Sequence, residues 1–137
     1  MAKRTTARKK VGNLGEDIAC RFLKGRGFVV LDRNYSKKWG EIDIIAEREG
    51  RVHFVEVKSV TREPQNHDGG VSRERDYVPE ELVDLRKLRK LARTAMLYME
   101  NTKDEREYQI DVVVVILDNR TRTAKCRYFG QALEDNL

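Results

Sequence analysis

The spacing of apolar residues along the chain predicts two long helices. In the first, apolar side chains recur at intervals of three and four residues from Leu14 to Leu23, as in a helix that packs one face on a core. Asn13 is the expected N-cap, and Gly25 is expected to end this helix. The second helix is predicted from Pro79 to about residue 101. Its apolar stripe consists of Leu82, Leu85, Leu88, Ala92, Ala95 and Met99.

Shorter apolar runs predict four to five strands. The predicted strands cover residues 28–31, 41–47, 52–60, 108–117 and 125–129, and residues 34–40 are predicted to form a turn-rich link. A helix between the third and fourth strands implies a crossover connection. The pattern therefore predicts an α/β fold, in which a mixed sheet of four to five strands is flanked by two main helices.

The chain length of 137 residues suits one domain with one core. Residues 1–11 are predicted to be a basic, flexible tail, because the first ten carry five basic and no acidic side chains. Residues 12–137 are predicted to form a single domain. Within it, residues 61–78 lack periodicity and predict a long loop. Its arginines either become ordered on nucleic acid or only keep a flexible segment soluble.

The turn predicted at residues 48–51 fixes the register of the strands on either side of it. With this register, Asp43 lies opposite Glu56, and Glu41 lies opposite Lys58. The other face then pairs apolar residues, Ile44 with Val55 and Ile42 with Val57. Because this register also separates polar from apolar residues, the hydrophobic pattern supports it independently of the turn.

Two carboxylates on directly opposed residues, with Cβ atoms about 4.5–5.5 Å apart, repel each other unless a positive charge lies beside them. A divalent ion meets this need, and oxygen ligands suit Mg²⁺ or Mn²⁺. Lys58, on the same face as Glu56, is placed to orient or deprotonate a water, as metal-assisted phosphodiester hydrolysis requires. The alternative is a cross-strand ladder of salt bridges. The apolar strand around Glu56 favours the metal site, because charges there are costly unless they are used.

The charge and the composition limit the classes of partner that the protein is expected to have. The net charge of +5 suggests a polyanionic partner, and the candidate nucleic-acid contacts on the second helix are Arg86, Lys87, Lys90 and Arg93. The longest apolar run, residues 112–117, is too short to span a bilayer, and no apolar segment of signal-peptide type follows the basic N-terminus. The expectation is a cytoplasmic protein without a membrane partner. Cys20 and Cys126 show no zinc-ribbon spacing and are expected to be unbridged.

The segments GEIDIIA at residues 40–46 and FVEVK at residues 54–58 resemble the YraN family (UPF0102), and matching residues extend from Gly15 to Val113. That family looks related to PD-(D/E)xK nucleases and to archaeal Holliday junction resolvases. The resemblance implies a restriction-endonuclease-like core and a Mg²⁺- or Mn²⁺-dependent endonuclease that acts on DNA, including branched or recombination-intermediate DNA. The implied metal ligands are Asp43, Glu56 and the backbone carbonyl of Val57, with Lys58 as the catalytic lysine and Glu16 as an additional acid.

One departure from the family leaves a second hypothesis open. Where the family usually has Lys-Gln in the second helix, this chain has Lys87-Leu88. The alternative is a non-catalytic nucleic-acid-binding module on a nuclease fold, and a third class is an adaptor whose basic helix contacts an acidic protein. A resolvase-like role would favour a homodimer. His53 is expected to pack on the apolar face of its strand. For Trp39 the alternatives are stacking on a base and packing against the end of the sheet, and packing is favoured.

Overall fold

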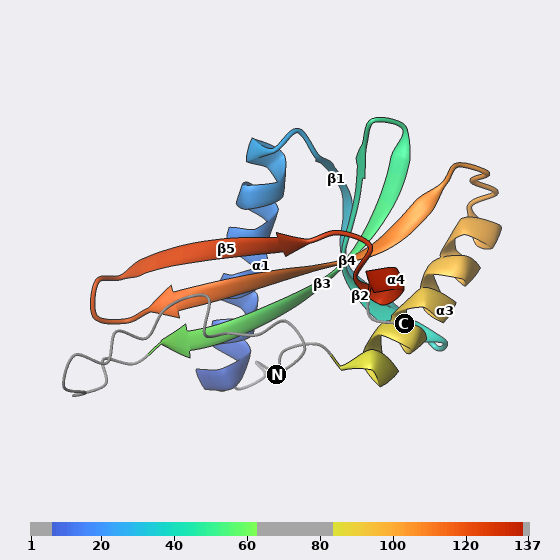
Figure 1. Cartoon of the computed structure of the whole chain (residues 1–137). Helices are drawn as coiled ribbons and strands as arrows, with labels where there is room; N and C mark the ends of the chain where they lie inside the picture. Colours follow the sequence, from blue (N-terminus) through green and yellow to red (C-terminus); the bar gives the residue numbers. More distant parts are fainter. Residues whose placement is uncertain (1–6, 63–83, 136–137) are drawn as a thin grey trace, which may run out of the picture.

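A computed structural model describes residues 7–62 and 84–135. Within these residues the chain forms a five-stranded mixed sheet in the order β1-β2-β3-β4-β5, with helices packed on it (Figure 1). The strands are β1 (Val29–Lys37), β2 (Gly40–Arg48), β3 (Arg51–Arg62), β4 (Tyr108–Asp118) and β5 (Thr123–Phe129). The helices are α1 (Ala7–Gly25), α3 (Leu85–Asn101) and the short α4 (Ala132–Asp135). The predicted α/β fold is confirmed, and its sheet and two main helices are consistent with a restriction-endonuclease-like core.

One pair of neighbouring strands in the sheet is parallel. β3 and β4 run parallel, and the other neighbouring strands are antiparallel. The parallel pair requires the crossover that the sequence predicts, and α3 lies on that crossover. In the part of the chain that the structure describes, no helix combines the length and the apolar character needed to cross a membrane.

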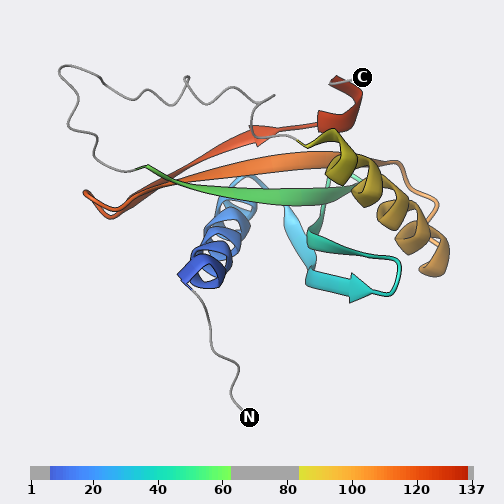
Figure 2. The same ribbon diagram turned by 90° about the horizontal axis from the view of Figure 1, so that it is seen from below.

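Alternate residues of the central strands face two separate apolar clusters. On the side of α3, Phe54 of β3 and Val112 of β4 pack with Leu88 and Leu91. On the side of α1, Val55 and Val113 belong to a second cluster that also contains Leu23 of the helix. In Figures 1 and 2, α1 and α3 lie apart from each other along the sheet. The two-sided burial explains the nearly continuous apolar run in β4.

The first residues of both long helices differ from the sequence prediction. α1 begins at Ala7, so the predicted N-cap at Asn13 is wrong and the helix takes in residues 7–11 of the predicted tail. α3 begins at Leu85, and Asp84 is an extended N-cap whose carboxylate accepts hydrogen bonds from the backbone N–H groups of the next turn. A helix continuous through Asp84 is therefore wrong. The start predicted at Pro79 lies outside the described residues, as does the predicted loop beyond Arg62.

β1 is longer than predicted. It continues to Lys37 and pairs with β2 as far as Gly40, so the link predicted at residues 34–40 is wrong. Only Lys38 and Trp39 form the turn. β1 lies at the edge of the sheet, its side chains are mostly exposed, and a register shift interrupts its pairing near Val30. Because such an edge strand buries little surface, it carries no apolar alternation for a sequence pattern to detect.

The β2–β3 hairpin follows the predicted register near its turn. Glu47 pairs with Val52 and Ile44 with Val55, as expected. The turn itself has two residues, Glu49 and Gly50, with φ values of 53° and 76°. Positive φ at both central positions is typical of a type I′ turn, which matches the twist of the flanking strands.

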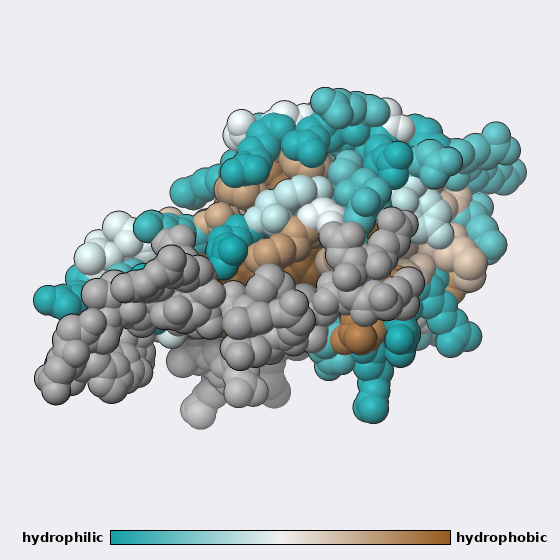
Figure 3. Space-filling view, viewed as in Figure 1, coloured by the Kyte–Doolittle hydropathy of each residue, from teal (hydrophilic) through white to brown (hydrophobic). Residues whose placement is uncertain are grey.

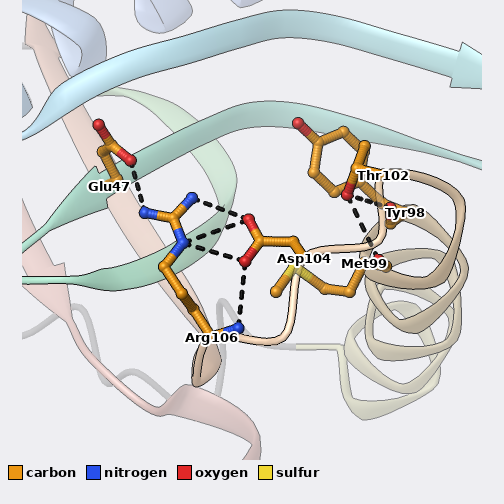
Figure 4. Close-up of polar contacts among 6 residues, drawn as sticks. All are labelled: Glu47, Tyr98, Met99, Thr102, Asp104 and Arg106. Atoms are coloured by element: carbon orange, nitrogen blue, oxygen red, sulfur yellow. Dashed lines mark hydrogen bonds and ion pairs between the residues drawn. The ribbon is translucent and has the colours of Figure 1, made fainter.

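A cluster of polar contacts holds the segment after α3 against β2 (Figure 4). The guanidinium of Arg106 donates to Glu47 at 2.7 Å and to Asp104 at 2.8 Å. At the end of the helix, the Thr102 hydroxyl donates to the carbonyl oxygen of Tyr98 at 2.8 Å. These contacts fix where the chain enters β4. On the face that Figure 3 shows, hydrophilic residues surround a central area of hydrophobic ones.

Candidate functional site

A pocket of about 510 Å³ lies where the tip of the β1–β2 hairpin, β3 and the start of α3 meet. Its acidic lining residues are Glu41, Asp43 and Glu56, and its basic lining residues are Lys37, Lys38, Lys87 and Lys90. Trp39, Gly40 and Leu91 complete the wall. The pocket therefore combines carboxylates on strands with ammonium groups around them, drawn from segments that are far apart in the sequence.

Asp43 is held by the backbone of the neighbouring strand. The N–H of Val57 donates to Asp43 Oδ2 at 2.8 Å. The described backbone pairing between β2 and β3 ends at Ile44 and Val55, so the Asp43 carboxylate replaces a strand carbonyl as the acceptor. The predicted backbone pair between Asp43 and Glu56 is therefore wrong, although both side chains line the pocket. The hydrogen bond fixes one carboxylate oxygen of Asp43 against β3.

The predicted apolar pairing also fails beyond this point. Ile42 belongs to the cluster beneath α3, whereas Val57 packs against the cluster beneath α1. The two residues therefore do not share an apolar face. A one-face pattern requires continuous pairing, and the Asp43 side chain has taken the acceptor position that would continue it.

Burial and charge both oppose ionisation of Glu56. Burial, and then the neighbouring Asp43, raise the pKa of Glu56 to about 7, while Lys87 and Lys58 act in the opposite direction. The pKa of Asp43 is also raised, chiefly by burial, and the Val57 N–H offsets part of this effect. Lys87 Nζ lies 3.6 Å from Glu56 Oε1. The two carboxylates are thus only partly compensated, and this arrangement favours an additional cation.

Glu16, on α1, is close enough to Asp43 for the two charges to interact. Burial raises its pKa, and Asp43 is the second cause. Its Oε1 atom is buried and has no hydrogen-bond partner among the described residues. The helix comes close to β3 because Gly15 has no side chain, and a methyl group there would overlap the Ser59 side chain. Asp43 therefore raises the pKa of two other acids, Glu56 and Glu16.

The oxygen donors suit a hard divalent cation. Asp43 and Glu56 offer carboxylate oxygens, and the Glu16 atom is an acceptor without a partner. Within the described residues, however, no group of three Asp, Glu, His or Cys side chains is close enough to hold a metal ion. An ion would therefore use few protein ligands and keep several waters, which is ordinary for Mg²⁺.

The predicted basic residues fall into different places. Lys58 is exposed and is not part of the pocket lining, so its effect on Glu56 is electrostatic. Lys87 and Lys90 line the pocket, whereas Arg86 and Arg93 are exposed on α3 outside it. The structure thus brings Lys87, rather than Lys58, closest to the Glu56 carboxylate. The catalytic role of Lys58 and the nucleic-acid contacts of the four basic residues of α3 stay predictions.

Leu88, which stands where the related family usually has glutamine, is buried in the apolar cluster beneath α3. Its side chain therefore fills core volume and adds no polar group to the pocket.

Trp39 is less buried than a fully packed tryptophan. It is 40% exposed and lines the pocket, so part of the indole is open to solvent. The sequence places the hairpin tip that carries it in a loose link, and the pocket wall forms only when that tip meets α3. Lys37 and Lys38 reach the pocket with it and are not among the predicted nucleic-acid contacts.

A buried polar network on the side of α1 is not predicted from the sequence. Asp111 is fully buried and accepts hydrogen bonds from Tyr128 OH at 2.8 Å and Gln109 Nε2 at 2.7 Å. The backbone N–H of Gln131 donates to it, and His53 Nδ1 lies 2.6 Å from its second oxygen. His53 is buried, as expected, but it is hydrogen-bonded as well as packed. The signal in the sequence is an aspartate inside the apolar run of β4.

Comparison with known proteins identifies relatives over most of the chain. The model of the uncharacterised protein family UPF0102 matches residues 15–115. A UPF0102 protein of Campylobacter jejuni is 40% identical over 104 residues, which cover 76% of this chain and 81% of that protein. A UPF0102 protein of Dictyoglomus turgidum is 37% identical over 125 residues, which cover 90% of this chain and 97% of that protein.

Proposed function

Since the chain belongs to the uncharacterised protein family UPF0102, we propose its function from the pocket: the protein is a nuclease that hydrolyses DNA phosphodiester bonds with Mg²⁺ or Mn²⁺. The observation that carries the proposal is the pair Asp43 and Glu56, which line one pocket with four lysines. Partly compensated carboxylates beside ammonium groups provide for both a cation and a phosphate.

Each residue in or beside the pocket has a distinct role in this proposal. Asp43 and Glu56, with the backbone carbonyl of Val57, would hold the ion, and a bound ion polarises the phosphate and activates water. Lys87 balances the charge of Glu56, 3.6 Å away. Lys58, two residues from Glu56 on the same strand but outside the pocket lining, would orient the attacking water. Lys90 and the hairpin lysines bind the phosphates on either side of the cleaved bond.

The substrate class follows from the groups that line the pocket. Its lysines suit backbone phosphates, which carry no sequence information, so we infer recognition of backbone and shape. We therefore favour branched DNA, such as recombination intermediates, in the cytoplasm. A homodimer would let two pockets address both strands of a junction.

The test is a cleavage screen with Mn²⁺ over duplex, single-stranded, flap and four-way DNA. Asp43→Asn keeps an oxygen that can accept from the Val57 N–H, so the fold is preserved while the charge is lost. We expect cleavage to fall at least 100-fold in this variant and in Glu56→Gln, and to disappear in Lys58→Ala. The exposed Glu100→Gln is the matched control. Undiminished cleavage by Glu56→Ala contradicts the site assignment.

A second candidate function is non-catalytic nucleic-acid binding. The observation that favours it is the ion pair between Lys87 and Glu56, which partly occupies the cation position, together with the burial of Leu88 in the core. This alternative predicts salt-dependent DNA binding through Arg86, Lys87, Lys90 and Arg93, with no cleavage in any divalent metal. Binding without cleavage over the whole screen would select it.

A further inference from the structure

Trp39 is placed as a binding group at the mouth of the pocket. It lies at the tip of the β1–β2 hairpin, between Lys38 and Gly40, and lines the same pocket as Asp43 and Glu56. Its 40% exposure is high for a large apolar side chain. None of the ring pairs and cation–ring contacts found among the described residues involves it. Much of the indole is thus available to a ligand.

The backbone of the hairpin tip is fixed against α3. The Thr94 hydroxyl lies 3.3 Å from the carbonyl oxygen of Trp39 and 3.0 Å from that of Lys90, so it bridges the tip and the helix. Gly40 has a φ of 149°, and a methyl group there would overlap the Thr94 side chain. This close approach requires glycine. The backbone that carries Trp39 therefore lies against the helix that carries Lys87 and Lys90.

The charges around Trp39 indicate what it binds. Lys37 and Lys38 precede it on the hairpin, and Lys87 and Lys90 lie across the pocket on α3. Ammonium groups on both sides of an aromatic surface suit a chain of phosphates that carries bases between them. In a continuous duplex the base faces are stacked on one another and are closed to an indole, whereas an unpaired nucleotide exposes its face.

Resting on the proposed function, we propose that Trp39 stacks on an unpaired base next to a phosphate that the lysines of the pocket hold beside Asp43 and Glu56. The preferred substrates are then nucleic acids with unpaired nucleotides, such as single strands, flaps and open branch points. Continuous duplex is bound only through its phosphates. Trp39 is a specificity-determining residue in this scheme, because it selects the substrate without taking part in the hydrolysis.

The chain offers a direct readout, since Trp39 is its only tryptophan. The experiment titrates the full-length protein with single-stranded dT oligonucleotide and with blunt duplex in EDTA, where no metal-dependent cleavage occurs. We expect the single strand to quench the tryptophan fluorescence and the duplex to leave it nearly unchanged. Binding of the single strand without quenching would overturn the proposal.

Variants supply the affinity test, measured by anisotropy of labelled DNA. Trp39→Ala should weaken single-strand binding by about 5- to 100-fold, the range for loss of one stacked base, and should leave duplex binding within twofold. Trp39→Phe retains a ring and should retain most of the affinity. Equal weakening on both substrates by Trp39→Ala would contradict a stacking role.

Stacking by Trp39 and hydrolysis at the carboxylates can fail separately. Quenching by single strands with no cleavage in the Mn²⁺ screen would retain the stacking role and reject the nuclease. Cleavage of single strands that Trp39→Ala leaves undiminished would retain the nuclease and reject the stacking role. Vesicles containing anionic lipid test a membrane surface as the partner of the lysines and the indole. A larger fluorescence change with vesicles than with single-stranded DNA would overturn the proposal.

Discussion

The carboxyl group of Glu56 binds a proton more tightly in the folded protein than in the unfolded chain. Its pKa is raised from 4.5 to about 7, first by burial and then by Asp43. Between these values the native state holds more protons, so the contribution of Glu56 to the free energy of unfolding falls as the pH rises through this window. Removing the charge should therefore stabilise the protein above the window and have little effect below it.

We predict that Glu56→Gln in EDTA leaves the stability nearly unchanged at about pH 4.5 and increases it by up to about 3 kcal/mol at about pH 8. Urea unfolding at both pH values measures the difference. The exposed Glu100→Gln should stay within about 0.5 kcal/mol of the parent at each pH. A Glu56→Gln variant that is less stable than the parent at pH 8 would show that the ion pair with Lys87 outweighs the burial of the charge.

Asp111 differs from Glu56, because its carboxylate is fully buried and both of its oxygens have hydrogen-bond partners. Asp111→Ala would leave the partners from His53, Gln109, Tyr128 and Gln131 without their acceptor. We predict a loss of about 3–5 kcal/mol in the free energy of unfolding. Thermal and urea unfolding measure it. Asp118→Ala, which removes two turn hydrogen bonds at a less buried position, is the control and should cost about 1 kcal/mol. Equal losses in the two variants would contradict the importance of the network.

At the scale of elements, the position of α1 depends on Gly15, which packs against β3, and not on Gly12, which has no neighbour outside the helix among the described residues. Gly15 meets the Ser59 side chain of β3, whereas nothing lies within 4 Å of a methyl group built at Gly12 of the same helix. The same substitution should thus have opposite effects three residues apart. The comparison separates helix propensity from packing, since both sites gain the propensity of alanine.

We predict that Gly12→Ala stabilises the protein by up to about 1 kcal/mol, and that Gly15→Ala destabilises it by about 1–3 kcal/mol. Urea unfolding measures both. Ser59→Gly removes the atoms that the new methyl group meets, so the double variant Gly15→Ala/Ser59→Gly should show favourable coupling in a double-mutant cycle. Stabilisation by both alanine variants would mean that α1 does not depend on this contact.

The elements also show how far the sequence alone determines this fold. The turn and register of the β2–β3 hairpin are predictable because Gly50 and the alternation around Phe54 agree. β1 is predicted too short because an exposed edge strand has no apolar alternation.

The prediction that Asp43 and Glu56 share a site rests on regular pairing. The structure brings both to one pocket by another route, in which the Val57 N–H binds the Asp43 side chain. The position of Trp39 in the pocket wall depends on the hairpin tip meeting α3, a contact between segments that no local pattern describes.

At the scale of the whole molecule, the distribution of the charge matters more than its sum. The net charge of +5 attracts any polyanion weakly, whereas lysines from the hairpin and from α3 converge on the pocket. Each phosphate neutralised by a lysine releases bound counterions, so the salt dependence of binding counts the contacts. Two triple variants with the same net charge can therefore distinguish local binding from general attraction.

We predict that replacing the pocket residues Lys37, Lys38 and Lys90 by glutamine lowers the slope of log K against log salt by roughly 2–3. The matched control replaces Arg21, Lys24 and Arg120, which are exposed and outside the pocket lining, and should keep most of the slope. Anisotropy of labelled single-stranded DNA in EDTA, between about 50 and 200 mM salt, measures both. Because the two variants lose the same charge, an equal decrease would mean that the protein binds nucleic acid through its overall field. A decrease confined to the pocket variant means that the phosphates follow the hairpin and α3 across the carboxylates.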